Sequence, residues 1–208
     1  MAAFLATSFV ARMKIVSYNM NGFNQGKSLL TDLFDRYDAI FCQEHWLSSD
    51  FLFKISAVDK EFLCFSESGM IDTIVSRVLT GRPFGGLSIL VANTLAAKAK
   101  LVSMNTHFIA ISLKNMLFVN MYLPTCDSSE EYKSKLLDIL CAVGECIDKH
   151  PGFGRFLGGD FNFVFNDSKW SYRTLLEFFE DISHRRYRGP IVLKIAVKLT
   201  LDCRETMR

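Results

Sequence analysis

The chain has 208 residues, of which 50% are hydrophobic and 22% charged, and its formal net charge is only +2. This is the composition of an ordinary globular domain, and the length is sufficient for one domain with a substantial core. The longest apolar runs, such as residues 87–95, fall well short of the roughly 20 residues that a membrane-spanning helix needs. We therefore expect no transmembrane segment and no membrane partner.

The basic residues are concentrated at the end of the chain. Residues 185–208 contain seven Lys or Arg against Asp202 and Glu205, a local charge of +5, whereas residues 1–184 hold 17 basic and 20 acidic residues. A basic tail is compatible with nucleic-acid binding. It is equally what a random or frame-shifted end of a sequence looks like.

The cysteines indicate a reducing compartment. The six of them, at positions 42, 64, 126, 141, 146 and 203, form no C-x-x-C pair and lie mostly in apolar runs. We expect free thiols in a nuclear or cytoplasmic protein rather than disulfides or a structural zinc site. The apolar residues 1–10 lack a basic stretch before them, so residues 1–12 are interpreted as a short extension and not as a targeting signal.

The first half of the chain predicts strands alternating with one helix. A strand is predicted over residues 14–18, followed by turn-forming residues 19–22. Ser28 is the predicted N-cap of an amphipathic helix whose apolar face carries Leu29, Leu30, Leu33, Phe34 and Tyr37. Buried strands are predicted over 39–43 and 62–65, and residues 66–86, rich in Gly, Ser and Thr, are expected to form a loop.

The second half predicts further strands and two helices. Residues 87–91, 99–102, 108–113 and 116–121 suggest an antiparallel series, with Lys114-Asn115 as a hairpin turn. Ser128 and Glu131 form a capping box that begins the longest helix, and a strand over 154–157 and a helix over 170–182 follow. The pattern predicts one mixed α/β (α+β) domain over residues 13–182, with two packed sheets and helices outside, and a basic tail at 183–208.

Polar residues follow the ends of four predicted strands: Asn19 and Asn21, Glu44, Tyr122, and Asp160 with Asn162. Ligands of α/β sheets gather at the carboxyl ends of strands, so we expect these groups to converge. Two carboxylates with carboxamides are typical of a site for a hard cation such as Mg²⁺. Alternation along a strand would point Asp160 and Asn162 the same way, whereas a Gly-Asp turn that closes the strand is the alternative.

Five short motifs occur in order along the chain: Ser17 to Gly22, Cys42 to Leu47, Gly81 to Gly86, Asn120 to Pro124 and Gly158 to Asn162. Together they resemble the motifs of the endonuclease/exonuclease/phosphatase superfamily. Within it, the residues 44–47 and 81–86 most resemble the apurinic-type endonuclease domain of LINE-like non-LTR retrotransposons. Each motif alone is weak, but five in order are specific, and the resemblance covers residues 13 to about 165. It implies a four-layered sandwich of two mixed β-sheets flanked by helices.

The resemblance also implies an activity, that of a Mg²⁺-dependent endonuclease-like hydrolase of DNA phosphodiesters, with Mn²⁺ as an alternative metal. Glu44 would bind the metal with the help of Asn19. Asp160 would orient or deprotonate the attacking water, and Asn162 and Tyr122 would donate hydrogen bonds to the phosphate. The product would be a nicked DNA strand.

Weaker phosphate contacts are assigned to Arg82 and Asn21, although a solvated loop side chain is an equal alternative for Arg82. Structural roles stay open for other residues of the motifs. These are strand capping for Glu44, a turn for Asn19, core packing for Tyr122, a structural position for His45, and packing rather than base stacking for Trp46.

The resemblance stops after Asn162. Members of the family finish with a late Ser-Asp-His segment on a final strand, and Ser183-His184 has no Asp between its residues. We therefore expect a fragment of a longer retroelement protein that lacks the last strands of one sheet. Two further hypotheses follow, namely a catalytically inactive remnant that at most binds nucleic acid through residues 185–208, and a phosphatase- or sphingomyelinase-type relative.

Overall fold

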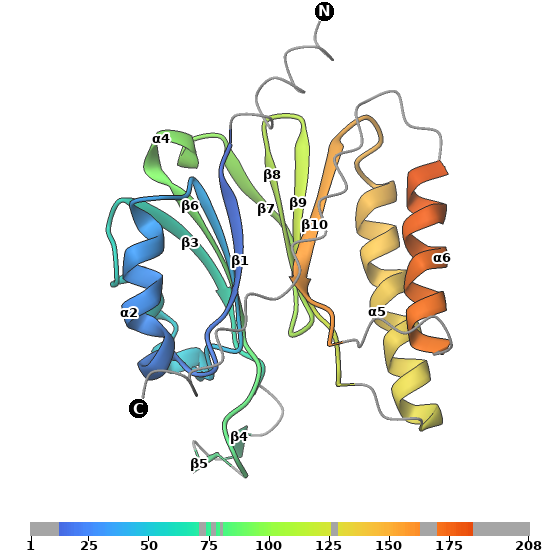
Figure 1. Ribbon diagram of the computed structural model, residues 1–208, viewed down its shortest axis with the longest axis horizontal. Helices are drawn as coiled ribbons and strands as arrows, with labels where there is room; N and C mark the ends of the chain where they lie inside the picture. The colour runs from blue at the N-terminus through green and yellow to red at the C-terminus, as the bar shows by residue number, and fades with distance from the viewer. Residues whose placement is uncertain are drawn as a thin grey trace, which may run out of the picture.

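Two four-stranded mixed sheets pack face to face in the computed structural model (Figure 1). The first has the order β1 (Ile15–Asn19), β2 (Ala39–Gln43), β6 (Leu87–Ala92), β3 (Phe62–Glu67), and the second β10 (Gly154–Asp160), β9 (Met116–Tyr122), β8 (Phe108–Leu113), β7 (Ala99–Met104). β1 and β2 are parallel, as are β9 and β10, and the other pairs are antiparallel. The predicted mixed sheets are confirmed.

The structure describes residues 13–70, 74–75, 78–79, 81–125, 129–162 and 170–184. Several predictions concern residues outside this part of the chain. They are those for the extension at 1–12, for the tail from 185 onward, and for Cys126, Ser128 and Cys203. In the described part, Cys42, Cys64, Cys141 and Cys146 are free thiols. No helix of that part combines the length and the apolar character needed to cross a membrane.

Helices cover the outer faces of both sheets, which gives four layers (Figure 1). α2 (Phe23–Phe34) packs on the first sheet, and α5 (Glu130–Asp148) with α6 (Trp170–His184) packs on the second. Shorter elements connect the strands: η1 (Ser49–Phe51), α3 (Phe53–Ser56), β4 (Ile74–Val75), β5 (Val78–Leu79) and α4 (Asn93–Ala96). The predicted four-layered sandwich is therefore confirmed.

The central core lies between the sheets and is rich in aromatic rings. Phe156 of β10 contacts Phe41 of β2 edge to face, with ring centroids 5.6 Å apart, and Phe118 of β9 at 5.7 Å. Each of these side chains is buried, and burying one such ring contributes about 1.5–3 kcal/mol. The core thus holds β2 of one sheet close to β9 and β10 of the other.

Helix α2 begins at Phe23, so the prediction of Ser28 as its N-cap is wrong. The backbone N–H groups of Gly22 and Phe23 donate to the carbonyl oxygens of Glu44 and His45, at 2.8 and 2.9 Å. These contacts between segments distant in sequence fix the first turn, although no side chain caps it. A local capping pattern could not reveal them.

Three other features differ from the prediction: the N-cap of α5, the position of β6 in the sheets, and the structure of one predicted loop. The N-cap of α5 is Ser129, whose side chain accepts from the N–H of Tyr132. β6 lies between β2 and β3 in the first sheet and does not extend the antiparallel series of β7 to β9. The loop predicted over residues 66–86 contains the short pair β4 and β5.

A buried polar network joins the two sheets just behind the strand ends. The side-chain amide of Gln43, at the end of β2, donates to the Asn120 side chain of β9 at 2.7 Å and to Ser17 of β1 at 3.1 Å. The Asn120 amide in turn donates to the carbonyl oxygens of Cys42 and Ser88, both at 3.0 Å. Because an unpaired buried amide is costly, this network fixes the register of the sheets at this end of the sandwich.

His45 is fully buried and ties the loop after β2 to the first sheet. Its Nδ1 accepts from the N–H of Leu47 at 3.0 Å, so its Nε2 carries the proton and donates to the Glu67 carbonyl oxygen at 3.1 Å. Gly86 lies directly against the ring, where a Cβ atom would come within 2.3 Å of it. Burial lowers the pKa of His45 from 6.5 to about 4, so the imidazole is neutral near pH 7.

This low pKa predicts acid sensitivity. Between pH 6.5 and about 4 the unfolded chain binds a proton at His45 that the folded protein does not bind, so the free energy of unfolding should fall across this range. His45 alone accounts for a loss of up to about 3 kcal/mol. Urea unfolding in metal-free buffer, at about pH 7 and about pH 4.5, should show a clearly smaller loss for His45→Gln than for the parent. Equal losses in the parent and in His45→Gln would contradict the assignment.

Candidate active site

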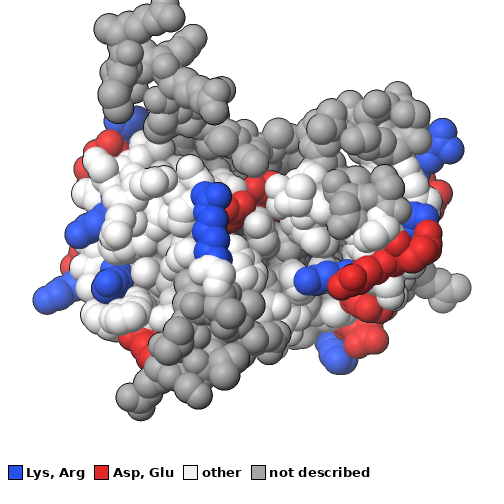
Figure 2. All heavy atoms as spheres, turned by 90° about the horizontal axis from the view of Figure 1, so that it is seen from below, with Lys and Arg blue, Asp and Glu red and all other residues white. Residues whose placement is uncertain are grey.

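The ends of β1, β2, β9 and β10 bring four of the predicted residues together. The side-chain amide of Asn19 donates to Asp160 Oδ2 at 2.7 Å and to Glu44 Oε1 at 3.3 Å. The Tyr122 hydroxyl donates to the same Glu44 oxygen at 3.1 Å. Figure 2 looks onto this end of the sandwich and shows a small recessed acidic patch near the middle of the face.

Glu44 has hydrogen-bond donors on both carboxylate oxygens. Asn19 and Tyr122 donate to Oε1, and the indole Nε1 of Trp46 donates to Oε2 at 3.1 Å. Glu44 is nevertheless only half-buried. The structure therefore orients this carboxylate and does not merely use it to cap β2.

The backbone around the site is strained. Positive φ angles occur at Asn21 (49°), Glu44 (55°), Trp46 (56°) and Asn162 (50°), and the fifth such non-glycine residue in the described part is Lys114 of the predicted hairpin turn. A non-glycine residue in this conformation costs on the order of 1 kcal/mol. Strain of this kind persists where surrounding contacts enforce it, and here it turns the loops after β1, β2 and β10 toward one another.

Asp160 and Asn162 are placed differently from the prediction. β10 continues through both glycines and ends at Asp160, whereas Asn162 lies beyond the strand. Strand alternation therefore does not orient this pair. The N–H of Asn162 donates to Asp160 Oδ1 at 3.1 Å, and its side-chain amide donates to the Leu123 carbonyl oxygen at 2.7 Å. At Gly159, a Cβ atom would lie 1.9 Å from the Met121 carbonyl oxygen, so only glycine allows β10 to approach β9 here.

Tyr122 is a stable hydrogen-bond donor. Burial raises the pKa of its hydroxyl well above the usual value, and the negative charges of Glu44 and Asp160 raise it further. A hydrogen bond from Asn162 opposes this shift only partly. The phenol therefore stays protonated throughout the physiological range.

The structure gives different surroundings to Arg82 and Asn21, the two residues assigned as weaker phosphate contacts. Arg82 lies with its guanidinium carbon 5.3 Å from the centre of the Trp46 ring, so the ring, and not a site carboxylate, is the partner that the structure gives it. Asn21 is exposed, and its backbone N–H donates to Asn19 Oδ1 at 3.0 Å. Asn21 thus orients the side chain of Asn19 through its backbone.

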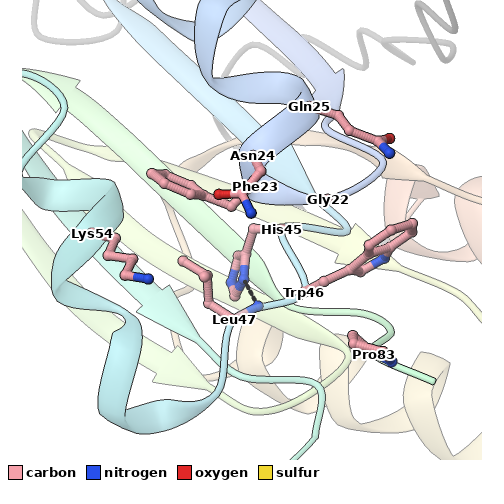
Figure 3. Close-up of a pocket in the computed structure, with 9 residues that line it drawn as sticks. All are labelled: Gly22, Phe23, Asn24, Gln25, His45, Trp46, Leu47, Lys54 and Pro83. Atoms are coloured by element: carbon pink, nitrogen blue, oxygen red, sulfur yellow. Dashed lines mark hydrogen bonds between the residues drawn. The ribbon is translucent and has the colours of Figure 1, made fainter. Parts of the chain in front are cut away.

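Trp46 is the residue that sequence reasoning missed. Its indole N–H bonds Glu44, and its ring lies against Gly22, where a Cβ atom would come within 2.6 Å of it. Figure 3 shows the ring at the mouth of a pocket beside this loop. The only sequence signal was the spacing of two residues between Glu44 and Trp46, which does not by itself indicate a contact.

The side chains of the site suit a hard divalent cation. The groups that converge are the carboxylates of Glu44 and Asp160 and the carboxamide of Asn19, and Mg²⁺ and Mn²⁺ prefer such oxygen ligands. In the described residues no group of three or more His, Cys, Asp or Glu side chains is gathered as a metal cluster.

Solved structures with the same fold come from DNA-processing proteins. The 3′ phosphatase NExo from Neisseria, bound to a product DNA hairpin, aligns with a TM-score of 0.60 and 14% identity over 82% of this chain and 71% of its own. The AP endonuclease from Archaeoglobus fulgidus aligns with a TM-score of 0.59 and 13% identity over 81% of this chain and 70% of its own. The AP endonuclease LMAP from Leishmania major aligns with a TM-score of 0.62 and 11% identity over 82% of this chain and 66% of its own. At these identities the likeness shows the fold.

The sequence comparisons give the family. No curated protein sequence matches the chain significantly. The model of the Endonuclease/Exonuclease/phosphatase family matches residues 16–176, which run from the second residue of β1 through β10 and include the residues of the candidate site. The chain belongs to the endonuclease/exonuclease/phosphatase family.

Proposed function

We propose that the protein is a Mg²⁺-dependent endonuclease-like hydrolase of DNA phosphodiesters. The observation that carries the proposal is the Asn19 amide, which lies between the carboxylates of Glu44 and Asp160 at 3.3 and 2.7 Å. Supporting it are the family and the folds shared with two AP endonucleases and with a 3′ phosphatase bound to DNA. Mn²⁺ is the alternative metal.

Glu44 and the Asn19 side-chain oxygen would hold the ion. When bound, a divalent cation neutralises phosphate oxygens and stabilises the leaving alkoxide. Asp160 would orient a water molecule and accept its proton as the water oxygen attacks phosphorus and the bond from phosphorus to the 3′ oxygen breaks. Hydrogen bonds from Asn19 and from the Asn162 N–H hold the Asp160 carboxylate for this role.

Tyr122 and Asn162 would supply donors to the phosphate. The Asn162 amide spans the Leu123 carbonyl oxygen and the Tyr122 hydroxyl, and Tyr122 donates onward to Glu44. This chain of hydrogen bonds keeps neutral donors beside two negative charges. A phosphate that entered would exchange one of these contacts for a bond to its own oxygen.

We further propose that the protein derives from a LINE-like retroelement, on the strength of the five ordered motifs.

A second candidate function is nucleic-acid binding with little turnover. It is favoured by the absence, in the described residues, of a third acidic or histidine side chain grouped with the two carboxylates. Loss of a general acid or base typically lowers a rate by ~10² to 10⁴, so a protein of this kind would bind metal and DNA yet cleave slowly.

Removing the charge of Glu44 should weaken metal binding and slow cleavage. Glu44→Gln keeps the size of the side chain, but it should weaken Mn²⁺ binding at least about tenfold and lower Mg²⁺-dependent nicking of supercoiled plasmid by ~10² or more. Calorimetry and a gel assay measure the two effects. Glu145→Gln, an exposed position on α5, is the control. Nicking by Glu44→Gln at the parent rate would show that the metal ligand is misassigned.

Tyr122→Phe tests the donor role. It keeps the ring but removes the hydroxyl that bonds Glu44, so nicking should fall by roughly 10- to 100-fold while the protein stays folded. Because the pKa of Tyr122 is raised, its hydroxyl does not ionise near pH 8 to 9, and the parent and variant rate profiles should have the same shape there. A change in the nicking rate between pH 8 and 9 that occurs in the parent but not in the variant would contradict the donor role, since it would mean that the tyrosine titrates there.

A further inference from the structure

A pocket lies beside Glu44 on the first-sheet side of the site. It is lined by the first turn of α2, by residues 45–47, by Lys54 of α3 and by Pro83, and its volume is about 280 Å³. Figure 3 shows Lys54 on one side of it and Trp46 with Pro83 on the other. Among the residues that line it, Lys54 is the only Lys, Arg, Asp or Glu.

Trp46 joins this pocket to the carboxylate site. Its indole N–H bonds Glu44 Oε2, one edge of its ring packs over Gly22, and Arg82 lies at its ring with the guanidinium carbon 5.3 Å from the ring centre. A group bound in the pocket would therefore lie one side chain away from Glu44. The cations at the pocket are Lys54, which lines it, and Arg82, which lies at the ring of Trp46.

Exposed phenylalanines lie close in sequence to two residues that line the pocket, Lys54 and Pro83. Phe51 and Phe53 precede Lys54 on η1 and α3 and are 49% and 62% exposed, and Phe84, next to Pro83, is 45% exposed. In the described part of the chain these are the only phenylalanines that are so exposed. The Lys54 ammonium lies 4.5 Å from the centre of the Phe51 ring. Near the pocket, two cations thus lie at aromatic rings, Lys54 at Phe51 and Arg82 at Trp46.

We propose that this surface, formed by Trp46, Phe51, Phe53, Lys54, Arg82 and Phe84 and here called the aromatic track, binds unpaired DNA next to the scissile phosphate. The inference rests on the proposed function and specifies its substrate as a strand that is unpaired beside the cut. Bases of a single strand expose their faces and stack on aromatic rings, each stacked base contributing roughly 5- to 100-fold in affinity. In a duplex these faces are covered by neighbouring bases.

The charge of the track also favours a single strand over a duplex. Proteins that bind duplex DNA through its backbone typically neutralise about 6 to 10 phosphates. The aromatic track offers two cations, Lys54 and Arg82, and three exposed phenylalanines. Stacking with limited phosphate contact is the balance expected for single-stranded DNA.

The test is DNA binding by the full chain in the presence of Ca²⁺, with fluorescent oligo(dT) of about 12 nucleotides compared with a duplex of the same length. The parent should bind the single strand more tightly. The double variant Phe51→Ala/Phe53→Ala should weaken that binding at least about 20-fold and change duplex binding less than about twofold. Phe51→Tyr/Phe53→Tyr keeps the stacking faces and should retain parental affinity. Since both positions are exposed, melting curves of all variants should coincide.

Trp170→Ala is the matched control. Trp170 of α6 is 41% exposed and has the ammonium of Lys133 at 5.9 Å from a ring centre, but it lies with the helices of the second sheet. Its loss should leave oligo(dT) binding unchanged. Equal affinity of the parent for single strand and duplex would overturn the proposal, as would parental binding by the alanine variant or an equal effect of Trp170→Ala.

The nicking assay separates this inference from the proposed function. If the parent does not nick plasmid with Mg²⁺ but binds oligo(dT) through the two phenylalanines, the proposed function fails and the aromatic track stands. If the parent nicks and the alanine variant binds oligo(dT) as the parent does, the track is wrong and the proposed function stands. If the parent binds neither the single strand nor the duplex, the proposal that the aromatic track binds DNA is wrong, and a protein becomes the better candidate for its partner.

Discussion

The side-chain amide of Asn19 is the contact on which the candidate site depends. It donates to Asp160, the last residue of β10, and to Glu44, which follows β2, so one carboxamide joins carboxylates from both sheets. Two carboxylates this close repel each other unless a donor or a cation lies between them. The amide nitrogen is such a donor, and the amide oxygen is of the kind that hard cations prefer as ligands. The packing of the two sheets is therefore itself a condition for the chemistry.

Two features of the fold keep this contact in place. The buried bonds between Gln43 and Asn120 hold the sheets in register behind the site. In front of it, the strained loops at Asn21 and Glu44 turn polar groups inward, because tertiary contacts fix backbone angles that these residues do not prefer. Rigid packing behind and enforced turns in front allow a site built from four separate strands to keep a single geometry.

Much of the fold and part of the site could be predicted from the sequence. Hydrophobic runs located most strands, and polar residues at the strand ends identified Asn19, Glu44 and Asp160 as neighbours. The errors occur where contacts distant in sequence decide local structure. The start of α2 is set by carbonyl oxygens of the loop after β2, and the position of Asn162 by a positive φ angle beyond β10. Neither leaves a periodic signal in the sequence.

Trp46 shows how the site and the surface beside it are linked. Its indole N–H holds one oxygen of Glu44, while its ring forms the wall of the neighbouring pocket. A ring fixed by this bond on one side and by Gly22 on another cannot turn without disturbing the carboxylate. A base stacked near it would thus be positioned relative to Glu44 before any reaction, which is how binding away from the scissile bond contributes to rate. If the aromatic track binds DNA as proposed, the track and the Glu44 carboxylate together position the substrate.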